Sequence, residues 1–210
     1  METVRKECGM ATTKRVLLAA GVIGALAAAW AVPAGSEAPP AELERARKAA
    51  QQLKGELMKN LTAALAEGGA PQGVRVCAEI APGIAAGLSK DGMTVRRVTT
   101  RPRNLANAPD AWETAQLEVF AAAHARGQMP DEIAEVVEAA PAGAARGTAR
   151  ELRYLSPLTI AAPCLQCHGD PAGIDPAVKA ALAETYPQDR ATGYKAGDFR
   201  GAVSVRITLP

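Results

Sequence analysis

The residues in this sequence with the clearest cofactor chemistry lie together near its C-terminal end. Residues 162–170 read APCLQCHGD, with two cysteines separated by two residues and a histidine directly after the second. C-x-x-C-H is the attachment sequence for c-type haem, in which two thiols add to the porphyrin vinyl groups and the histidine becomes an axial ligand of the iron. The motif therefore predicts one covalent haem c on Cys164 and Cys167, with His168 as an iron ligand.

The N-terminal residues predict export from the cytoplasm. Lys14 and Arg15 precede an apolar run and then small residues, which is the order of a signal peptide. The run is short for a membrane span, which needs about 20 apolar residues. We expect a signal peptide or an uncleaved membrane anchor at residues 1–34, a linker at 35–40 and one haem-binding domain at 41–210. Such a protein would be periplasmic, free or tethered to the inner membrane, and would be loaded by c-type cytochrome maturation machinery.

Length and composition are those of a single globular domain. The 210 residues are 48% hydrophobic, and the formal net charge is +2. Beyond residue 34 the acidic and basic residues are equal in number, so the charge gives no reason to expect nucleic-acid binding. Membrane contact is expected only through an uncleaved N-terminal anchor.

Two other chemistries use the residue types of the C-terminal motif. A Cys-x-x-Cys pair forms a redox disulfide in thioredoxin-like proteins, but that motif belongs to a βαβ unit, and no such pattern precedes Cys164. A zinc site needs a fourth ligand, for which the chain beyond the leader offers Cys77 and His124. Export favours covalent haem, and a thiol-disulfide oxidoreductase and a zinc site remain the alternatives.

The first half of the domain has the spacing of helices. Apolar residues recur every three or four positions along residues 41–67, which predicts a helix ended by a Gly-Gly pair and Pro71. A second helix is expected over 72–88, bent or cut short by Pro82. Its apolar face is predicted to consist of Val74, Cys77, Ile80, Ala81 and Ile84.

The second half mixes predicted strands and helices. Strands are expected at 93–100, 148–160 and 202–209, the second interrupted by Pro157 and the last with one buried and one exposed face. Helices are expected from an Asp110 cap to about Gly127, at 133–140 and at 175–186. The apolar stripe of the first of these helices is predicted to be Trp112, Ala115, Val119 and Ala122. The order of elements predicts an α+β fold around a small antiparallel sheet.

The second iron ligand is less evident from residue types. His124 is expected at the surface, and Met58 is expected to fill the core on the long helix. Met93 and Met129 are the other methionines beyond the leader, and a methionine is a plausible second ligand, since it is a common partner of histidine in c-type haem. Cys77 is an unpaired thiol once the motif cysteines hold haem, and it is either a buried inert cysteine or a thiolate ligand; ligation explains its presence better.

The haem propionates would need cationic or hydroxyl partners. The available side chains are the arginine cluster Arg96, Arg97, Arg101 and Arg103 and the hydroxyls of Tyr154 and Tyr194. We select Arg101, Arg103 and Tyr154 as candidate propionate ligands.

Four motifs in order resemble a family of exported single-haem domains with a PAS-like α+β fold, first recorded as a domain of unknown function. They are VRVCAEIAPGIA (74–85), RRVTTRPRNLANAPDAWE (96–113), YLSPLTIAAPCLQCHG (154–169) and ATGYKAGDFRGAVSV (191–205). The resemblance implies a PAS-like fold with haem on Cys164 and Cys167, His168 as the proximal ligand and Cys77 as the distal ligand. Leu105 departs from the family pattern, in which Pro is more frequent.

The resemblance leaves two roles open, because such domains occur alone and in signalling proteins. As a cytochrome, the protein would pass electrons between redox partners. As a sensor of gas or redox state, it would act on a separate signalling protein. Two protein ligands leave no open iron position, so catalysis is not the default expectation.

Overall fold

The computed structural model describes residues 37–139 and 149–210. The predicted leader at 1–34 and the first two residues of the predicted linker lie outside the described residues. Within the described ranges, no helix is both long enough and apolar enough to cross a membrane. The linker ends at Pro39, because the first helix starts at Pro40.

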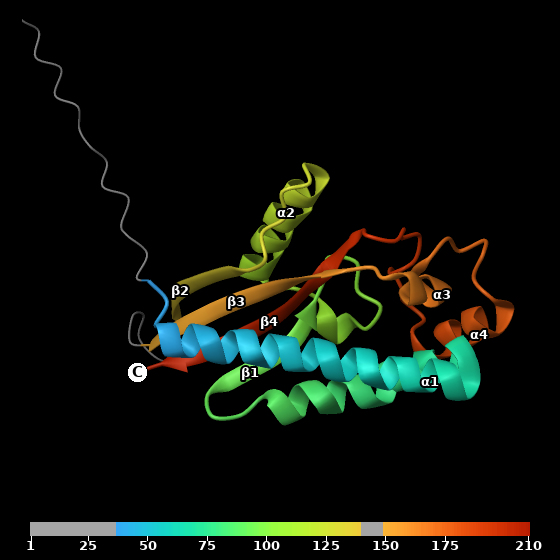
Figure 1. Cartoon of the computed structure of the whole chain (residues 1–210), viewed down its shortest axis with the longest axis horizontal. Helices are drawn as coiled ribbons and strands as arrows, with labels where there is room; N and C mark the ends of the chain where they lie inside the picture. The colour runs from blue at the N-terminus through green and yellow to red at the C-terminus, as the bar shows by residue number, and fades with distance from the viewer. Residues whose placement is uncertain (1–36, 140–148) are drawn as a thin grey trace, which may run out of the picture. The chain divides into compact units, whose positions relative to one another are not determined.

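The described residues form a four-stranded antiparallel sheet flanked by helices, as Figure 1 shows. The strand order is β1-β4-β3-β2, so the C-terminal strand lies in the middle of the sheet. The strands are β1 (Met93–Val98), β2 (Ile133–Ala139), β3 (Ala149–Thr159) and β4 (Phe199–Leu209). This arrangement confirms the predicted α+β, PAS-like fold with its small sheet and long N-terminal helix.

The long helix α1 (Pro40–Leu88) folds back on itself at its middle. Gly68 and Gly69 have non-helical backbone angles, and the positive φ of Gly69 (68°) favours glycine. After the reversal, a Cβ at Gly73 would lie 3.1 Å from Leu61 Cδ1, so a larger residue would push this side chain aside where the two halves pack. The two predicted helices are therefore confirmed, but the second continues through Pro82 to Leu88.

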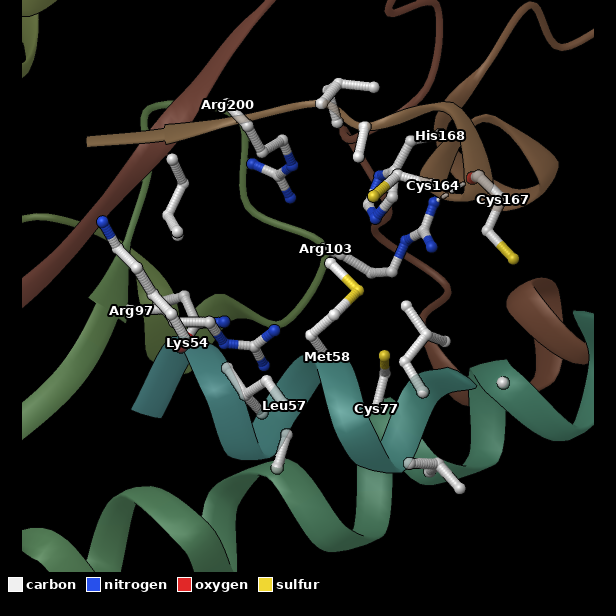
Figure 2. Close-up of a pocket in the computed structure, with 18 of the residues that line it drawn as sticks. Lys54, Leu57, Met58, Cys77, Arg97, Arg103, Cys164, Cys167, His168 and Arg200 are labelled. Atoms are coloured by element: carbon white, nitrogen blue, oxygen red, sulfur yellow. Dashed lines mark hydrogen bonds between the residues drawn. The ribbon is translucent and has the colours of Figure 1, made fainter. Parts of the chain in front are cut away.

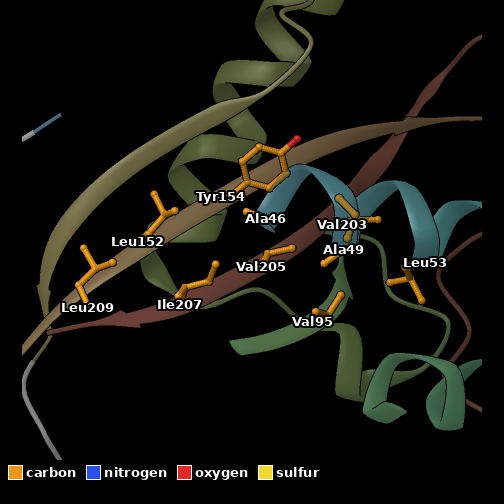
Figure 3. Packing of buried hydrophobic residues seen from close by; sticks show 11 residues of the cluster. Ala46, Ala49, Leu53, Val95, Leu152, Tyr154, Val203, Val205, Ile207 and Leu209 are labelled. Atoms are coloured by element: carbon orange, nitrogen blue, oxygen red, sulfur yellow. The ribbon is translucent and has the colours of Figure 1, made fainter. Parts of the chain in front are cut away.

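The main core lies between the first half of α1 and one face of the sheet (Figure 3). Small residues on the helix, including Ala46 and Ala49, let it approach the strands closely, and Leu53 inserts between them. The strand side of this core is formed by Val95, Leu152, Tyr154, Val203, Val205, Ile207 and Leu209. This packing fixes the direction of α1 across the sheet.

The helix α2 (Ala111–Ala125) begins with the predicted capping box. Asp110 accepts a hydrogen bond from Glu113 N, and Glu113 Oε2 accepts one from Asp110 N at 2.9 Å. The predicted stripe of the helix is wrong, because the buried residues are Glu113, Leu117, Phe120 and Ala123, and Val119 is half exposed. The reason is the fully buried Glu113, which accepts from Ser204 Oγ and pairs with Arg96, and so turns its own side of the helix inward.

Three further sequence predictions are corrected by the sheet. Residues 133–139 form β2 and not a helix, because they pair with β3 from Ile133↔Leu155 to Ala139↔Ala149. Pro157 does not interrupt β3, because it lies beyond the end of β2, where its missing N–H leaves no strand bond unmade. The second face of β4 is also buried at Ala202 and Ser204, since α2 covers that face.

Two short helices complete the fold. The 3-10 turn η2 (Ala162–Cys164) leads into α3 (Leu165–His168), and another 3-10 turn, η1, spans Leu105–Asn107. The helix α4 (Pro176–Thr185) starts as predicted, with Asp175 as its cap and Pro176 in its first turn. Val178 and Leu182 of α4 pack against Val74 of α1.

Candidate cofactor site

A cavity of about 490 Å³ opens between the two halves of α1, the ends of β1 and β3, and the segment η2–α3. Its volume lies in the range of about 300–1,000 Å³ that is usual for small-molecule and cofactor sites. Apolar side chains form much of its wall, among them Leu57, Leu61, Val74, Ile84 and Leu158. Figure 2 shows the polar and sulfur-containing residues that project into it.

The C-terminal motif forms a single compact turn at one side of the cavity. Cys164 ends η2, and Cys167 and His168 lie on the one turn of α3, so all three residues line the cavity. Gly169 ends α3, and a Cβ there would lie 2.6 Å from Leu165 O, so the residue after the histidine has no room for a side chain. The backbone of His168 is then fixed by Tyr194 N, which donates to its carbonyl oxygen at 2.9 Å.

His168 is prepared as a neutral nitrogen ligand. Its Nδ1 lies 2.6 Å from Ala191 O. A carbonyl oxygen only accepts hydrogen bonds, so Nδ1 carries the proton and Nε2 keeps a free lone pair. Burial lowers the pKa of His168 to about 3, and the charges of Arg103 and Arg200 add to this effect. The imidazole is therefore uncharged at neutral pH and can bind a metal without losing a proton.

Cys77 faces the same cavity from the second half of α1. In Figure 2 its sulfur points from the helix toward the side on which His168 and Cys164 lie. Burial raises the pKa of the Cys77 thiol, and the nearby charges of Arg97 and Arg103 oppose that rise. Cys77, Cys164 and Cys167 are all free thiols. In residues 37–139 and 149–210, no three His, Cys, Asp or Glu side chains are grouped closely enough to hold a metal ion.

The charged lining of the cavity is cationic. Lys54, Arg97, Arg103 and Arg200 line it, and no Asp or Glu of the described residues does. Arg200 is held by Thr99 Oγ1 at 2.7 Å, and Lys54 donates to Ser156 Oγ at 2.7 Å. Among the described residues, the Arg97 side chain makes no hydrogen bond. A cavity with apolar walls and cations but no acid suits an apolar ligand that carries negatively charged groups such as carboxylates.

Five of the predicted site residues line this cavity: Cys77, Cys164, Cys167, His168 and Arg103. Arg103 also supports the motif, because it donates to Cys167 O at 2.5 Å and pairs with Asp189 at 3.0 Å. It is thus both a cation of the cavity and a brace for the turn that carries the cysteines.

Arg101 and Tyr154, the other two candidate propionate ligands, do not line this cavity. Arg101 donates to Arg190 O at 3.2 Å and lies 4.3 Å from the centre of the Tyr194 ring, where it holds the loop before β4. Tyr154 points into the main core, and its hydroxyl donates to Glu132 at 3.1 Å. Burial is the largest cause that raises the pKa of Tyr154 to about 12.

Four further residues of the cavity were not selected from the sequence: Lys54 and Arg200 were not considered, and Met58 and Arg97 were considered but not chosen. Met58 was predicted to fill the core, yet it is 44% exposed and lines the cavity. Two of the four residues carried a signal in the sequence. Arg200 lies in the motif ATGYKAGDFRGAVSV, and Lys54 directly follows Leu53, a buried residue of the predicted apolar stripe. His124 was predicted to lie at the surface, and in the structure it is half-buried.

Comparison with known proteins identifies the family of the chain. A family model described as Tll0287-like matches residues 33–208. The chain therefore belongs to the Tll0287-like family.

A solved structure, that of the cyanobacterial haem protein Tll0287, resembles this chain with a TM-score of 0.58 and 27% sequence identity. The alignment covers 82% of this chain and 97% of that one. No curated protein matches the sequence.

Proposed function

We propose that this protein is an exported mono-haem c-type cytochrome. Haem would be attached through thioether bonds to Cys164 and Cys167, with His168 and Cys77 as the axial ligands of its iron. The observation that carries the proposal is the position of Cys77, which faces the cysteine-histidine motif across one cavity although 86 residues separate it from Cys164 in the sequence. The solved structure of a haem protein with 27% identity supports the same cofactor.

The lining of the cavity fits each part of a haem. Nε2 of His168 has a free lone pair, and the thiol of Cys77 supplies a soft ligand on the other side. Leu57, Val74 and Leu158 would contact the porphyrin faces and edges, and exclude water from them. Arg97 and Arg200 are the cations we propose for the propionates, together with Arg103, in place of Arg101 and Tyr154.

The ligands also indicate the kind of chemistry. When bound, haem supplies one-electron oxidation and reduction at its iron. A thiolate from Cys77 opposite His168 favours the oxidised form, so we expect a low reduction potential. With both axial positions occupied by protein groups, transfer of electrons to and from a redox partner is the function that the site supports best.

A second candidate is a haem-based sensor of redox state or of a gas. It is favoured by the placement of Cys77 on the second half of α1, since Ile84, Ala85 and Leu88 of that half pack against the main core. A change at Cys77 would act on a helix that is part of the main core, and a signalling partner that contacts α1 could detect it. A periplasmic location and haem attachment by c-type maturation machinery belong to both candidates.

The test is the absorption spectrum of protein exported in a host with c-type maturation. After denaturation in alkaline pyridine with dithionite, the spectrum should be that of a c-type haemochrome, and Cys164→Ser with Cys167→Ser should abolish it. Cys77→Ala should remove the thiolate character of the ferric spectrum, whereas the control Glu79→Ala, an exposed residue of the same helix, should not. Protein without covalent haem would leave a thiol-disulfide oxidoreductase as the better reading.

The two candidate roles are separated by the reduced protein. An electron carrier should show a reversible potential and no stable carbon monoxide complex. A gas sensor should form that complex and change its α1 protection from hydrogen exchange at the same time.

A further inference from the structure

Met58 is the one thioether that lines the cavity in the described part of the chain. Met93 packs at the edge of the main core, and Met129 packs against the cluster under α2. Met58 is 44% exposed although it lies on the helix that forms the core. In Figure 2, Met58 and Cys77 both extend from α1 toward the side of the cavity that holds His168.

The fold of α1 brings these two sulfur atoms to one place. Met58 lies on the first half of the helix and Cys77 on the second, and the reversal at Gly68 and Gly69 folds one half against the other. Met58 is one turn from Leu61, whose side chain meets the second half beside Gly73. Both sulfur atoms therefore face the same volume from neighbouring helix halves.

The Met58 side chain is free to move within that volume. It is unbranched, and its partial exposure leaves it fewer packing contacts than a core residue. A methionine side chain has three rotatable bonds beyond its Cα, so its sulfur can reach different points of the cavity without a change in the backbone.

The two sulfur groups have opposite preferences for the charge of iron. A thiolate donates strongly and favours ferric iron, whereas a methionine opposite histidine raises the reduction potential and so favours ferrous iron. The cavity thus offers one distal donor suited to each oxidation state.

Resting on the proposed function, we infer that Met58 replaces Cys77 as the distal iron ligand on reduction. The iron accepts one electron from a low-potential donor, and its bond to Cys77 Sγ breaks while a bond to Met58 Sδ forms. The released thiolate takes one proton from water and becomes a thiol. Oxidation by an electron acceptor returns the electron and reverses both bond changes, with loss of the proton.

The experiment compares Met58→Leu and Cys77→Ala with the wild type, each produced with c-type maturation. Covalent haem is measured first by the pyridine haemochrome. Leucine keeps the size and apolar character of Met58 but has no sulfur lone pair. Met129→Leu, which removes a thioether outside the cavity, is the matched control.

We expect resonance Raman spectra of the reduced wild type to show six-coordinate low-spin iron. In Met58→Leu the reduced iron should become five-coordinate and high-spin, while the oxidised spectrum stays that of the wild type. The same variant should have a lower reduction potential. It should bind carbon monoxide at least about tenfold more tightly, the factor that corresponds to about 1.4 kcal/mol of lost competing ligation.

Reduced Met58→Leu that matches the wild type in spectrum and carbon monoxide affinity would overturn the inference. The inference would also fail if Cys77→Ala changed the reduced spectrum as much as the oxidised one, because Cys77 would then stay bound. A change in Met129→Leu equal to that in Met58→Leu would contradict it as well. Absence of covalent haem from the wild type would overturn the proposed function itself, and the haemochrome detects this before any ligand is tested.

Discussion

Replacement of Arg103 by alanine should destabilise the protein and loosen the support of His168. The Arg103 side chain is 9% exposed, and its Nε lies 3.0 Å from Asp189 Oδ2. It also donates to Cys167 O, and Asp189 accepts from Ala191 N at 2.8 Å. Since Ala191 O holds Nδ1 of His168, Arg103 connects both backbone segments that position the motif.

The magnitude follows from what the substitution leaves behind. Removal of one partner of a buried ion pair costs about 3–5 kcal/mol, because the other charge stays buried without compensation. Asp189 is 13% exposed and keeps the hydrogen bond from Ala191 N, which places the expected loss at the lower end, about 3 kcal/mol. In a domain of this size, that loss lowers Tm by about 6–12 °C.

The assay is urea unfolding of the haem-loaded protein followed by circular dichroism, with Arg103→Lys as the charge-keeping control. In the double variant, Arg103→Ala with Asp189→Ala, the loss in free energy of unfolding should be smaller than the sum of the two single losses by about 0.5–3 kcal/mol. A loss below about 0.5 kcal/mol in Arg103→Ala, the size of an ordinary surface substitution, would refute the role of this pair. Strictly additive single losses would refute it equally.

Three other substitutions test the core, the charge network and the cavity. Leu53→Ala should lower the free energy of unfolding by about 2–5 kcal/mol in urea titrations, because Leu53 is fully buried in the main core. A loss as small as that of an ordinary surface substitution would contradict that packing. The hydrogen bond from Arg47 lowers the pKa of Glu132 below its ordinary value of 4.5. The stabilisation from the ionised Glu132 carboxylate is therefore present above about pH 4.5 and lost as pH falls through the folded pKa. Glu132→Gln should flatten the acid side of the plot of Tm against pH. An unchanged acid side would exclude this contribution. Burial raises the pKa of the Cys77 thiol, and the charge of Arg97 opposes the rise. Arg97→Gln should therefore raise this pKa further, as measured by thiolate ultraviolet absorbance in haem-free protein that lacks the motif cysteines. An equal or lower pKa would contradict the proximity of Arg97 to Cys77.

Local sequence signals predicted the helix ends well. Gly68 and Gly69 break α1 because glycine adopts the required backbone angles, and Asp110 and Asp175 cap α2 and α4 with their own side chains. These features depend on residues within one turn of each other, so a single sequence contains all the information needed. The same holds for the compact turn of the cysteine-histidine motif.

Elements whose form depends on distant partners were harder to predict. The seven residues of β2 are too few to separate a period of two from one of 3.6, and only pairing with β3 decides between them. The buried face of α2 is set by Glu113, a charged residue whose burial depends on Ser204 and Arg96.

The candidate site divides in the same way. The motif residues identify themselves by spacing, whereas the choice among the arginines required their directions in space. Arg101 is taken up by backbone carbonyls and Tyr194, while Arg97 and Arg200 point to the cavity lining from β1 and β4. No local pattern could have predicted that Cys77 faces the motif; that expectation came from its being the one cysteine beyond the predicted leader that lies outside the motif, and from resemblance to a family.

Intact mass spectrometry under denaturing conditions would reveal whether one haem is covalently bound to Cys164 and Cys167. The exported wild type should carry the mass of one haem in addition to its polypeptide. Protein with both Cys164→Ser and Cys167→Ser should carry none, while Cys77→Ala should retain it. A wild type with no added haem, or an added mass that survives loss of both motif cysteines, would contradict the account.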